Sequence, residues 1–256
     1  MVIETAKEKK EKTIKKKKKR KRKKWTINID EVMKIIIPEV TTRLGLDYLE
    51  LTEKELRDVI EPIVSSIIEA RKTKPTTESL IKRIINGKPM LFKALSAKML
   101  EREKLAPQQI EFILANAPEL AGRAAPRLYH EILEAGLEYL LDTLRYLWQR
   151  YGKPTRIQCP YCGFYAVTPD LSCIVCGRVI EERDLKKAIG FNKQLAMLAE
   201  VLDKSLLEEI IKAGFVVYDG DIHPPSLRQR LPHGVVLYLT REERDLLRRI
   251  LNREEA

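Results

Sequence analysis

The sequence has few of the patterns that usually identify an enzyme. It contains no glycine-rich phosphate loop and no Gly-x-Ser-x-Gly nucleophile motif. Only three histidines occur in 256 residues. One of them, His130, lies beside Tyr129 on an expected helix and has no neighbouring carboxylate or cysteine in the sequence, which favours a structural role. These absences argue against nucleotide hydrolysis and against serine-type acyl transfer.

Long apolar stretches are also lacking. No run approaches the roughly 20 apolar residues of a membrane-spanning helix. The charged N-terminal region is not followed by the apolar core of a secretory signal. We therefore expect a cytoplasmic protein with no membrane partner, in which cysteines stay reduced.

Charged residues are abundant, whereas Asn and Gln are scarce. Asp, Glu, Lys and Arg make up 33% of the chain, against an ordinary share of about a quarter. A bias toward Lys, Arg and Glu is typical of hyperthermophile proteins, so we expect an archaeal source, cellular or from a virus or plasmid. Apolar residues make up 44% of the chain, which is enough for a folded core.

The excess positive charge lies at one end of the chain. Residues 1–24 hold 14 of the 48 Lys and Arg and three of the 37 Asp and Glu, which leaves 34 of each in the remainder. The net charge of +11 therefore belongs to the first 24 residues. Repulsion between like charges and a near absence of apolar groups predict a disordered arm.

Ten consecutive cations end this arm, which is more than solubility requires. We expect it to bind a polyanion, with nucleic acid (DNA or RNA) ahead of an acidic protein surface; a solubilising or targeting tail is the alternative. The nucleic-acid-binding residues predicted here are Lys15, Lys16, Lys17, Lys18, Lys19, Arg20, Lys21, Arg22, Lys23 and Lys24.

All four cysteines lie within residues 159–176, as two Cys-x-x-Cys pairs separated by ten residues. Gly163 and Gly177 follow the pairs and permit a sharp turn. Four thiolates suit a closed tetrahedral site for a soft cation, so zinc is expected, with iron, disulfides or a redox pair as alternatives. The predicted ligands of one structural zinc ion are Cys159, Cys162, Cys173 and Cys176.

Two segments resemble the zinc-ribbon (rubredoxin-like) family: Cys159-Pro160-Tyr161-Cys162-Gly163 and Cys173-Ile174-Val175-Cys176-Gly177. The resemblance covers only about residues 155–181. It implies two metal-binding knuckles on short β-hairpins, and often contact with nucleic acid or with a protein partner. The pattern of β-forming residues predicts short strands at 164–167 and 178–180.

Residues 25–154 show the apolar spacing of amphipathic helices. Thr52 and Glu55 form a capping box. One long helix is expected from Pro126 to Tyr151. These signals predict a bundle of five to seven helices; a helix-turn-helix within 77–116 is an alternative interpretation of part of it.

Residues 182–213 are expected to be helical, with a break near Gly190, and a capping box at Thr240 and Glu243 predicts a final helix. Two antiparallel strands, 215–218 and 235–239, lie between these helices. We therefore expect a small α-β-β-α unit, because an isolated two-stranded sheet needs helices to pack on.

A polar loop, residues 219–233, joins the two strands and carries two candidate sites. Arg228 and Arg230 can bond phosphates or base edges, and we favour this role. The loop also carries Asp219, Asp221, His223 and His233, which could bind a divalent cation for phosphodiester cleavage. A turn rich in such residues for backbone reasons is the alternative to both.

The sequence thus predicts a mainly α protein with an N-terminal helical bundle, a central four-cysteine zinc ribbon and a small C-terminal α-β-β-α unit. We expect a non-enzymatic nucleic-acid-binding protein of information processing. An adaptor that contacts a protein partner through the ribbon is the first alternative, and a metal-dependent nuclease using the 219–233 loop is the second. The predicted domains are residues 1–24 (arm), 25–154 (bundle), 155–181 (ribbon) and 182–256 (α+β unit).

Overall fold

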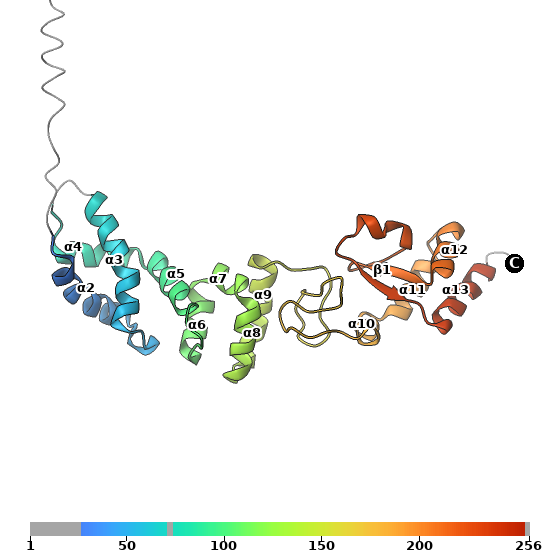
Figure 1. Ribbon diagram of the computed structural model, residues 1–256, viewed down its shortest axis with the longest axis horizontal. Helices are drawn as coiled ribbons and strands as arrows, with labels where there is room; N and C mark the ends of the chain where they lie inside the picture. Colours follow the sequence, from blue (N-terminus) through green and yellow to red (C-terminus); the bar gives the residue numbers. More distant parts are fainter. Residues whose placement is uncertain (1–26, 71–73, 254–256) are drawn as a thin grey trace, which may run out of the picture. The chain divides into compact units, whose positions relative to one another are not determined.

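A computed structural model of the chain describes residues 27–70 and 74–253 (Figure 1). The predicted basic arm, residues 1–24, lies outside the described residues. The chain divides into two compact units, one up to residue 87 and the other from residue 88 onward. This boundary falls inside the predicted helical domain, and the four-part division of the sequence stays a prediction.

Helices dominate both units, as the sequence predicts, and the only sheet in the described ranges is small. Unit 1 contains α2 (Ile29–Leu44), η1 (Asp47–Leu49), α3 (Glu53–Ala70) and α4 (Thr77–Asn86). Unit 2 contains α5 (Lys88–Met99), α6 (Pro107–Asn116), α7 (Pro118–Arg123), α8 (Ala125–Glu134), η2 (Glu138–Leu140), α9 (Leu141–Tyr151), α10 (Glu182–Ile189), α11 (Phe191–Ala199), α12 (Lys204–Ala213), β1 (Phe215–Tyr218), β2 (Ile222–His223), η3 (Pro225–Arg230), β3 (Val235–Tyr238) and α13 (Arg241–Arg253). None of the described helices combines the length and apolar character that crossing a bilayer requires.

In unit 1, α2 packs against both α3 and α4. Apolar residues from the three helices, among them Ile36, Ile60 and Ile84, are fully buried between them. Pro38 lies within α2 on its exposed side. Pro38 does not end the helix. The helix ends before Gly45, whose positive φ lets the amide of Leu46 donate back to the carbonyl of Thr41.

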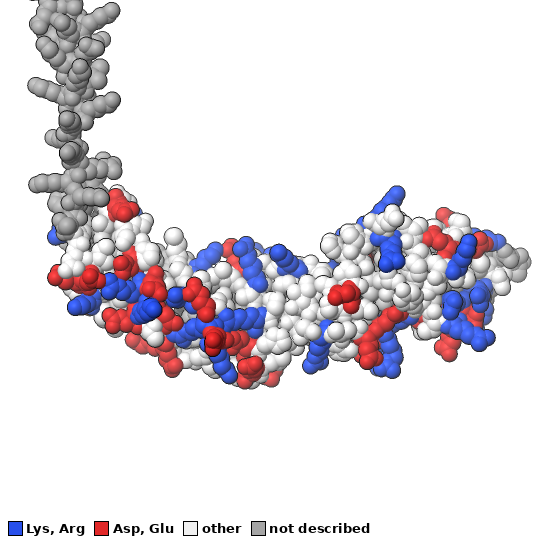
Figure 2. Space-filling model, viewed as in Figure 1, with Lys and Arg blue, Asp and Glu red and all other residues white. Residues whose placement is uncertain are grey.

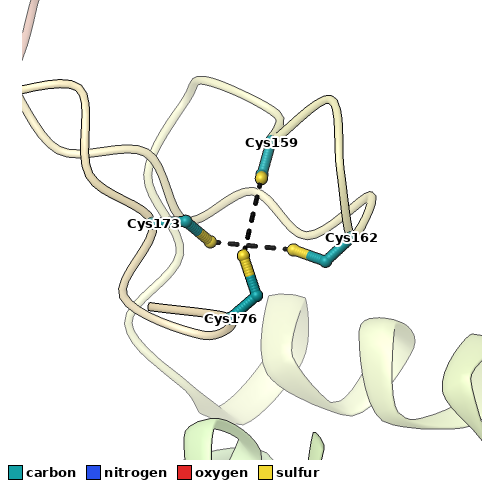
Figure 3. A group of neighbouring side chains, drawn as sticks. All are labelled: Cys159, Cys162, Cys173 and Cys176. Atoms are coloured by element: carbon teal, nitrogen blue, oxygen red, sulfur yellow. Dashed lines mark hydrogen bonds between the residues drawn. The ribbon is translucent and has the colours of Figure 1, made fainter. Parts of the chain in front are cut away.

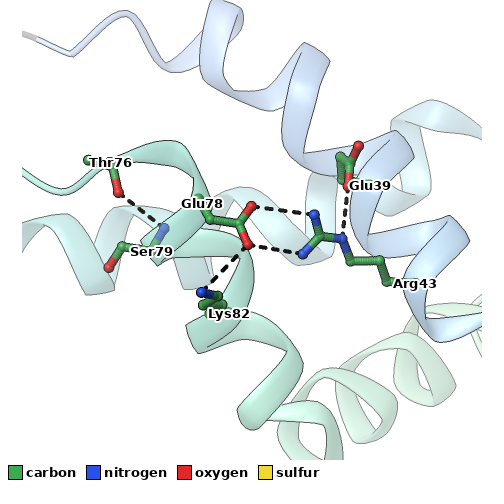
Figure 4. Close-up of polar contacts among 6 residues, drawn as sticks. All are labelled: Glu39, Arg43, Thr76, Glu78, Ser79 and Lys82. Atoms are coloured by element: carbon green, nitrogen blue, oxygen red, sulfur yellow. Dashed lines mark hydrogen bonds and ion pairs between the residues drawn. The ribbon is translucent and has the colours of Figure 1, made fainter.

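Polar contacts connect the same helices at the surface. The guanidinium of Arg43 donates to Glu39 on its own helix at 2.9 Å and to Glu78 on α4 at 3.2 Å (Figure 4). The hydroxyl of Thr76 caps α4 by accepting from the amide of Ser79. Because these ion pairs are exposed to solvent, they add little to stability, and the buried apolar face holds the unit together.

The capping box at the start of α3 is confirmed. The amide of Thr52 donates to the carboxylate of Glu55 at 2.8 Å, and the amide of Glu55 donates back to the hydroxyl of Thr52 at 3.3 Å. Two otherwise unpaired amides at the helix start are thereby satisfied.

The single helix predicted from Pro126 to Tyr151 is wrong, because two helices, α8 and α9, occupy this stretch. Gly136 adopts a φ of +68° after α8, and the amide of Leu137 then returns to the carbonyl of Ile132 at 2.9 Å. This is a glycine-based helix end. The leucines continue at helical spacing across the break, which is why periodicity alone did not show it.

Helix α7, which the sequence did not predict, packs against α9 at very short range. A Cβ atom added at Gly122 would lie 2.4 Å from the carbonyl oxygen of Leu147 and 2.8 Å from the Cβ of Tyr151. Only glycine allows the two backbones to approach this closely. The contact fixes α9, which in turn contacts the cysteine segment described below.

The C-terminal sheet has the strand order β2-β1-β3, and all its pairs are antiparallel. The predicted hairpin of β1 and β3 is confirmed, with Phe215 opposite Tyr238 and Tyr218 opposite Val235. The 219–233 stretch is more ordered than predicted, because it contains the strand β2 and the 3-10 helix η3. Helix α12 contacts β1, and α13 packs on α11 and α12, which supplies the helical cover that a small sheet needs.

The edge strand β3 is capped by two side chains of α10. Glu182 accepts from the amide of Tyr238 at 2.7 Å, and Lys186 donates to the carbonyl of the same residue. These contacts satisfy an edge position that would otherwise be free to pair with another strand. The predicted capping box of Thr240 and Glu243 is also confirmed, at 2.7 Å and 3.2 Å.

We predict that Gly122→Ala destabilises unit 2 strongly. The added methyl group must push α7 away from the backbone of α9, so we expect a loss of about 3 kcal/mol, at the upper end for overpacking. Gly136→Ala is the control, because it meets no atom within 4 Å and carries only the strain of a positive φ, about 1 kcal/mol. Chemical denaturation of both variants measures the difference. Equal losses would show that the α7–α9 contact can relax.

Candidate metal centre

The four cysteines converge on one buried point (Figure 3). All four are free and buried, and their sulfur atoms lie within 4.8 Å of one another. The Sγ atoms of Cys159 and Cys176 are 3.9 Å apart, and those of Cys162 and Cys173 are 3.6 Å apart. Each cysteine pair therefore contributes to both close contacts, as a single four-sulfur site requires.

These distances fit a metal-binding tetrahedron. A metal–sulfur bond of about 2.3 Å implies tetrahedral S···S edges of about 3.8 Å. The two shortest Sγ–Sγ distances, 3.6 and 3.9 Å, lie on either side of this value. Soft thiolates with no competing nitrogen or oxygen ligand favour a thiophilic metal ion. The residues present therefore fit a metal ion, which these four side chains would hold.

The two knuckles have the same backbone hydrogen bonds. In each, the amide of the first cysteine donates to the carbonyl five residues later, and the glycine four residues later donates back to the cysteine carbonyl. The contacts are Cys159 with Phe164 and Gly163, at 2.8 and 2.9 Å, and Cys173 with Arg178 and Gly177, both at 2.9 Å. This repeat places the cysteines of the two pairs in equivalent local geometry.

The predicted strands at 164–167 and 178–180 form only isolated bridges. Gln158 pairs with Tyr165, and Ser172 pairs with Val179, which again occupy equivalent positions in the two knuckles. Backbone hydrogen bonds continue beyond each bridge, from the amide of Ala166 to the carbonyl of Ile157 and from the amide of Ile180 to the carbonyl of Leu171. The two knuckles are joined by a further bridge, Val167 with Cys173, and by the amide of Ile174, which donates to the carbonyl of Ala166 at 2.9 Å.

Once one thiol of the cluster is ionised, its negative charge opposes the ionisation of the others. The Cys162 and Cys173 thiols hold the pKa of Cys159 well below its ordinary value, since they donate to its thiolate. The same neighbour, Cys159, raises the pKa of Cys162 and of Cys173, and burial raises both further. A bound cation would reverse this balance, because a coordinating thiol is deprotonated outright.

Two side chains of helix α9 donate hydrogen bonds to the backbone of the first knuckle. Arg145 donates from Nε to the carbonyl of Cys162 at 3.0 Å, and its guanidinium lies 5.8 Å from the ring centroid of Phe164. Trp148, one turn further along α9, donates from its indole to the carbonyl of Tyr165 at 2.9 Å. Sequence reasoning did not single out Arg145 or Trp148, because no local pattern links them to cysteines that follow in the chain.

The second metal site considered from the sequence does not form. Among the described residues, the cysteine cluster is the only group of three or more His, Cys, Asp or Glu side chains close enough to hold an ion. Asp219 is buried, and one of its oxygens lies 3.4 Å from Arg156. His223 lies on β2 opposite Val217. The described residues of this loop thus do not form a ligand cluster, and the nuclease stays an untested alternative.

The two arginines predicted to contact nucleic acid lie in η3 rather than in an irregular loop. Both Arg228 and Arg230 are exposed. The guanidinium of Arg228 lies 5.9 Å from the ring centroid of Phe215 on β1. Their role in nucleic-acid binding stays a prediction.

We predict that Cys162→Ser abolishes stoichiometric metal binding. A serine hydroxyl is a poor substitute for a thiolate, and the free energy of metal binding is also folding free energy in such a module. Native mass spectrometry should show about one metal ion per wild-type chain and none on the variant. Ile174→Ser is the control and should retain the ion, because Ile174 is exposed and lies between the second pair of cysteines. Metal retention by Cys162→Ser would contradict four-sulfur ligation.

The glycines after the two pairs should differ in their sensitivity to substitution. Both have a positive φ, +77° at Gly163 and +71° at Gly177, so alanine is strained by about 1 kcal/mol at either position. At Gly163 the new Cβ also lies 3.0 Å from Nε of Arg145, whereas at Gly177 it meets nothing within 4 Å. We expect Gly163→Ala to release metal at a lower chelator concentration than Gly177→Ala. The reverse order would show that the Arg145 contact does not constrain this knuckle.

Comparison with protein-family models, with curated proteins and with solved structures finds no match to this chain. The assignment of the metal centre therefore rests on spacing, burial and interatomic distance.

Proposed function

We propose that this chain is a non-enzymatic nucleic-acid-binding protein whose central module is a zinc ribbon stabilised by one structural Zn²⁺ ion. The burial of four cysteine side chains supports a closed site, because a catalytic zinc site keeps one position open for water or substrate. The repeated hydrogen bonds of the two knuckles support the ribbon assignment.

The separation of charge along the chain carries the proposal for nucleic acid. The first 24 residues have a net charge of +11, and the remaining residues have as many acidic as basic groups. A run of ten cations releases condensed counterions when it neutralises phosphates, and this release supplies affinity without sequence preference. The arm would therefore supply most of the affinity.

The folded part has a mixed surface. Figure 2 shows basic and acidic side chains interspersed over the visible face of the described residues. Several of these cations have nearby carboxylates as partners, such as Arg57 with Glu61 at 2.7 Å and Lys93 with Glu119 at 2.7 Å. Such pairs give little attraction to a polyanion at a distance, so the body would place the ligand rather than capture it.

An adaptor that docks on a protein is the second candidate, and one observation favours it. Two apolar residues of the cysteine module are exposed, Ile174 at 44% and Val179 at 75%. Docking on a protein partner would remove these apolar side chains from water. In this case the arm would serve as a tether to an acidic partner.

We predict that replacing the ten cations of residues 15–24 by Gln removes most of the affinity for nucleic acid. The wild-type affinity should fall steeply with salt, by a slope of about 0.9 per neutralised phosphate on duplex DNA, and the variant should show a much smaller slope. Fluorescence anisotropy with duplex and single-stranded oligonucleotides in a salt series measures both quantities.

Replacing Lys54 and Lys212 by Gln is the control, because it changes charge in the folded part alone. It should leave the salt slope within about one phosphate contact of wild type. If wild-type protein fails to bind either form of nucleic acid in dilute buffer, the proposal is wrong. Binding to a protein partner that is lost on Val179→Asp would then support the adaptor.

A further inference from the structure

Unit 2 contains a groove whose lining has more basic than acidic side chains. It has a volume of about 710 Å³ and lies among α10, the start of α11, the end of β3 and the start of α13. Of the side chains lining it, four are Lys or Arg and two are Glu. The groove therefore has a net positive charge, although the chain after residue 24 has none.

The charged groups on the floor of the groove, one cation and two carboxylates, are engaged in internal contacts. Lys186 lies 3.3 Å from Glu182 and 3.0 Å from Glu243, and its ammonium lies 4.8 Å from the ring centroid of the buried Phe191. Both carboxylates also accept backbone amides, those of Tyr238 and Thr240. These groups are committed to holding β3 and α13 against α10, so they are not free for a ligand.

The rim carries the cations that remain available. Lys187 and Lys193 are exposed, and no carboxylate in the described part of the chain pairs with either. Arg183 is 83% exposed and contacts only carboxylates outside the groove, those of Glu181 and Asp184. Two of these three rim cations are thus uncompensated, and the third is only weakly held.

Tyr238 supplies an aromatic surface at the same groove. It is 63% exposed, although its backbone is fixed by Glu182 and Lys186. Its ring meets that of Phe215 edge-on at 6.2 Å, which supports the ring without covering it. An exposed aromatic ring on a rigid backbone next to unpaired cations is the combination that binds unstacked bases and their phosphates.

We propose that this groove binds single-stranded nucleic acid, with phosphates on Lys187, Lys193 and Arg183 and a base stacked on Tyr238. A single strand is favoured over a duplex because a base must leave its neighbours to stack on a protein ring. The inference rests on the proposed function and deepens it, since the arm then supplies salt-sensitive capture and the groove supplies preference for the unpaired strand.

The test uses the full chain and homopolymeric single strands of thymidine and of uridine, with a duplex for comparison. Replacing both Lys187 and Lys193 by Gln should reduce the salt slope for single strands by about 1.4, because each lost phosphate contact is worth about 0.7. The Lys54→Gln and Lys212→Gln double variant is the charge-matched control and should leave this slope unchanged.

The ring is tested separately from the charge. Tyr238→Leu should weaken binding to single strands by about 5-fold to about 150-fold, the range for losing one base–aromatic stack, and should leave duplex binding unchanged. Tyr238→Phe keeps the ring and should bind as wild type does. Metal content and thermal melting of each variant show whether the fold is intact.

The outcomes separate this inference from the function on which it rests. If the groove variants bind single strands like wild type while the arm variant loses affinity, the groove inference is overturned and the proposed function stands. If wild type binds no nucleic acid, both fail. If Tyr238→Leu and Tyr238→Phe weaken binding equally, the stacking role is wrong. Polyglutamate serves as an anion without bases. If the groove variants weaken binding of polyglutamate as much as binding of the oligonucleotides, the groove is a general anion surface and the stacking role is wrong.

Discussion

Four sulfur atoms confined within 4.8 Å of one another impose the strongest constraint on this fold. The cysteine module spans fewer than about 40 residues, a size at which apolar burial alone seldom gives a stable fold. Several of its few apolar groups, such as Ile157 and Phe164, are already buried. Like-charge repulsion opposes ionisation of the four thiols together, and a bound cation would offset this repulsion and stabilise the module.

The cysteine module is tied to the helices before it by side-chain hydrogen bonds. Helix α9 packs closely on α7 along one side, where Gly122 allows the contact, and holds the first knuckle through Arg145 and Trp148. A change at the metal centre therefore reaches α9 through two hydrogen bonds to the knuckle backbone. Within unit 2, the metal would stabilise helical packing as well as its own module.

Charge has two distinct roles in the chain. In the folded part some acidic and basic groups stabilise local geometry, as Glu182 and Lys186 do when they cap the edge of β3. By sequence the largest run of cations is residues 15–24, and Lys187 and Lys193 line the groove without a carboxylate partner in the described part of the chain. Under the proposed function, affinity would come from the first set and placement from the second, and the two sets share no residue.

The sequence alone determined those features that depend on neighbours in the chain. The cysteine spacing predicted that the four thiols converge, and the capping boxes at Thr52 and Thr240 located two helix starts, because each signal acts over a few residues. The break at Gly136 was missed, since the apolar periodicity runs across it. Only the tertiary structure brought Tyr238 beside Glu182, 56 positions earlier. Such a juxtaposition depends on how helices and strands pack, and packing is set by contacts among distant residues that leave no periodic trace along the chain.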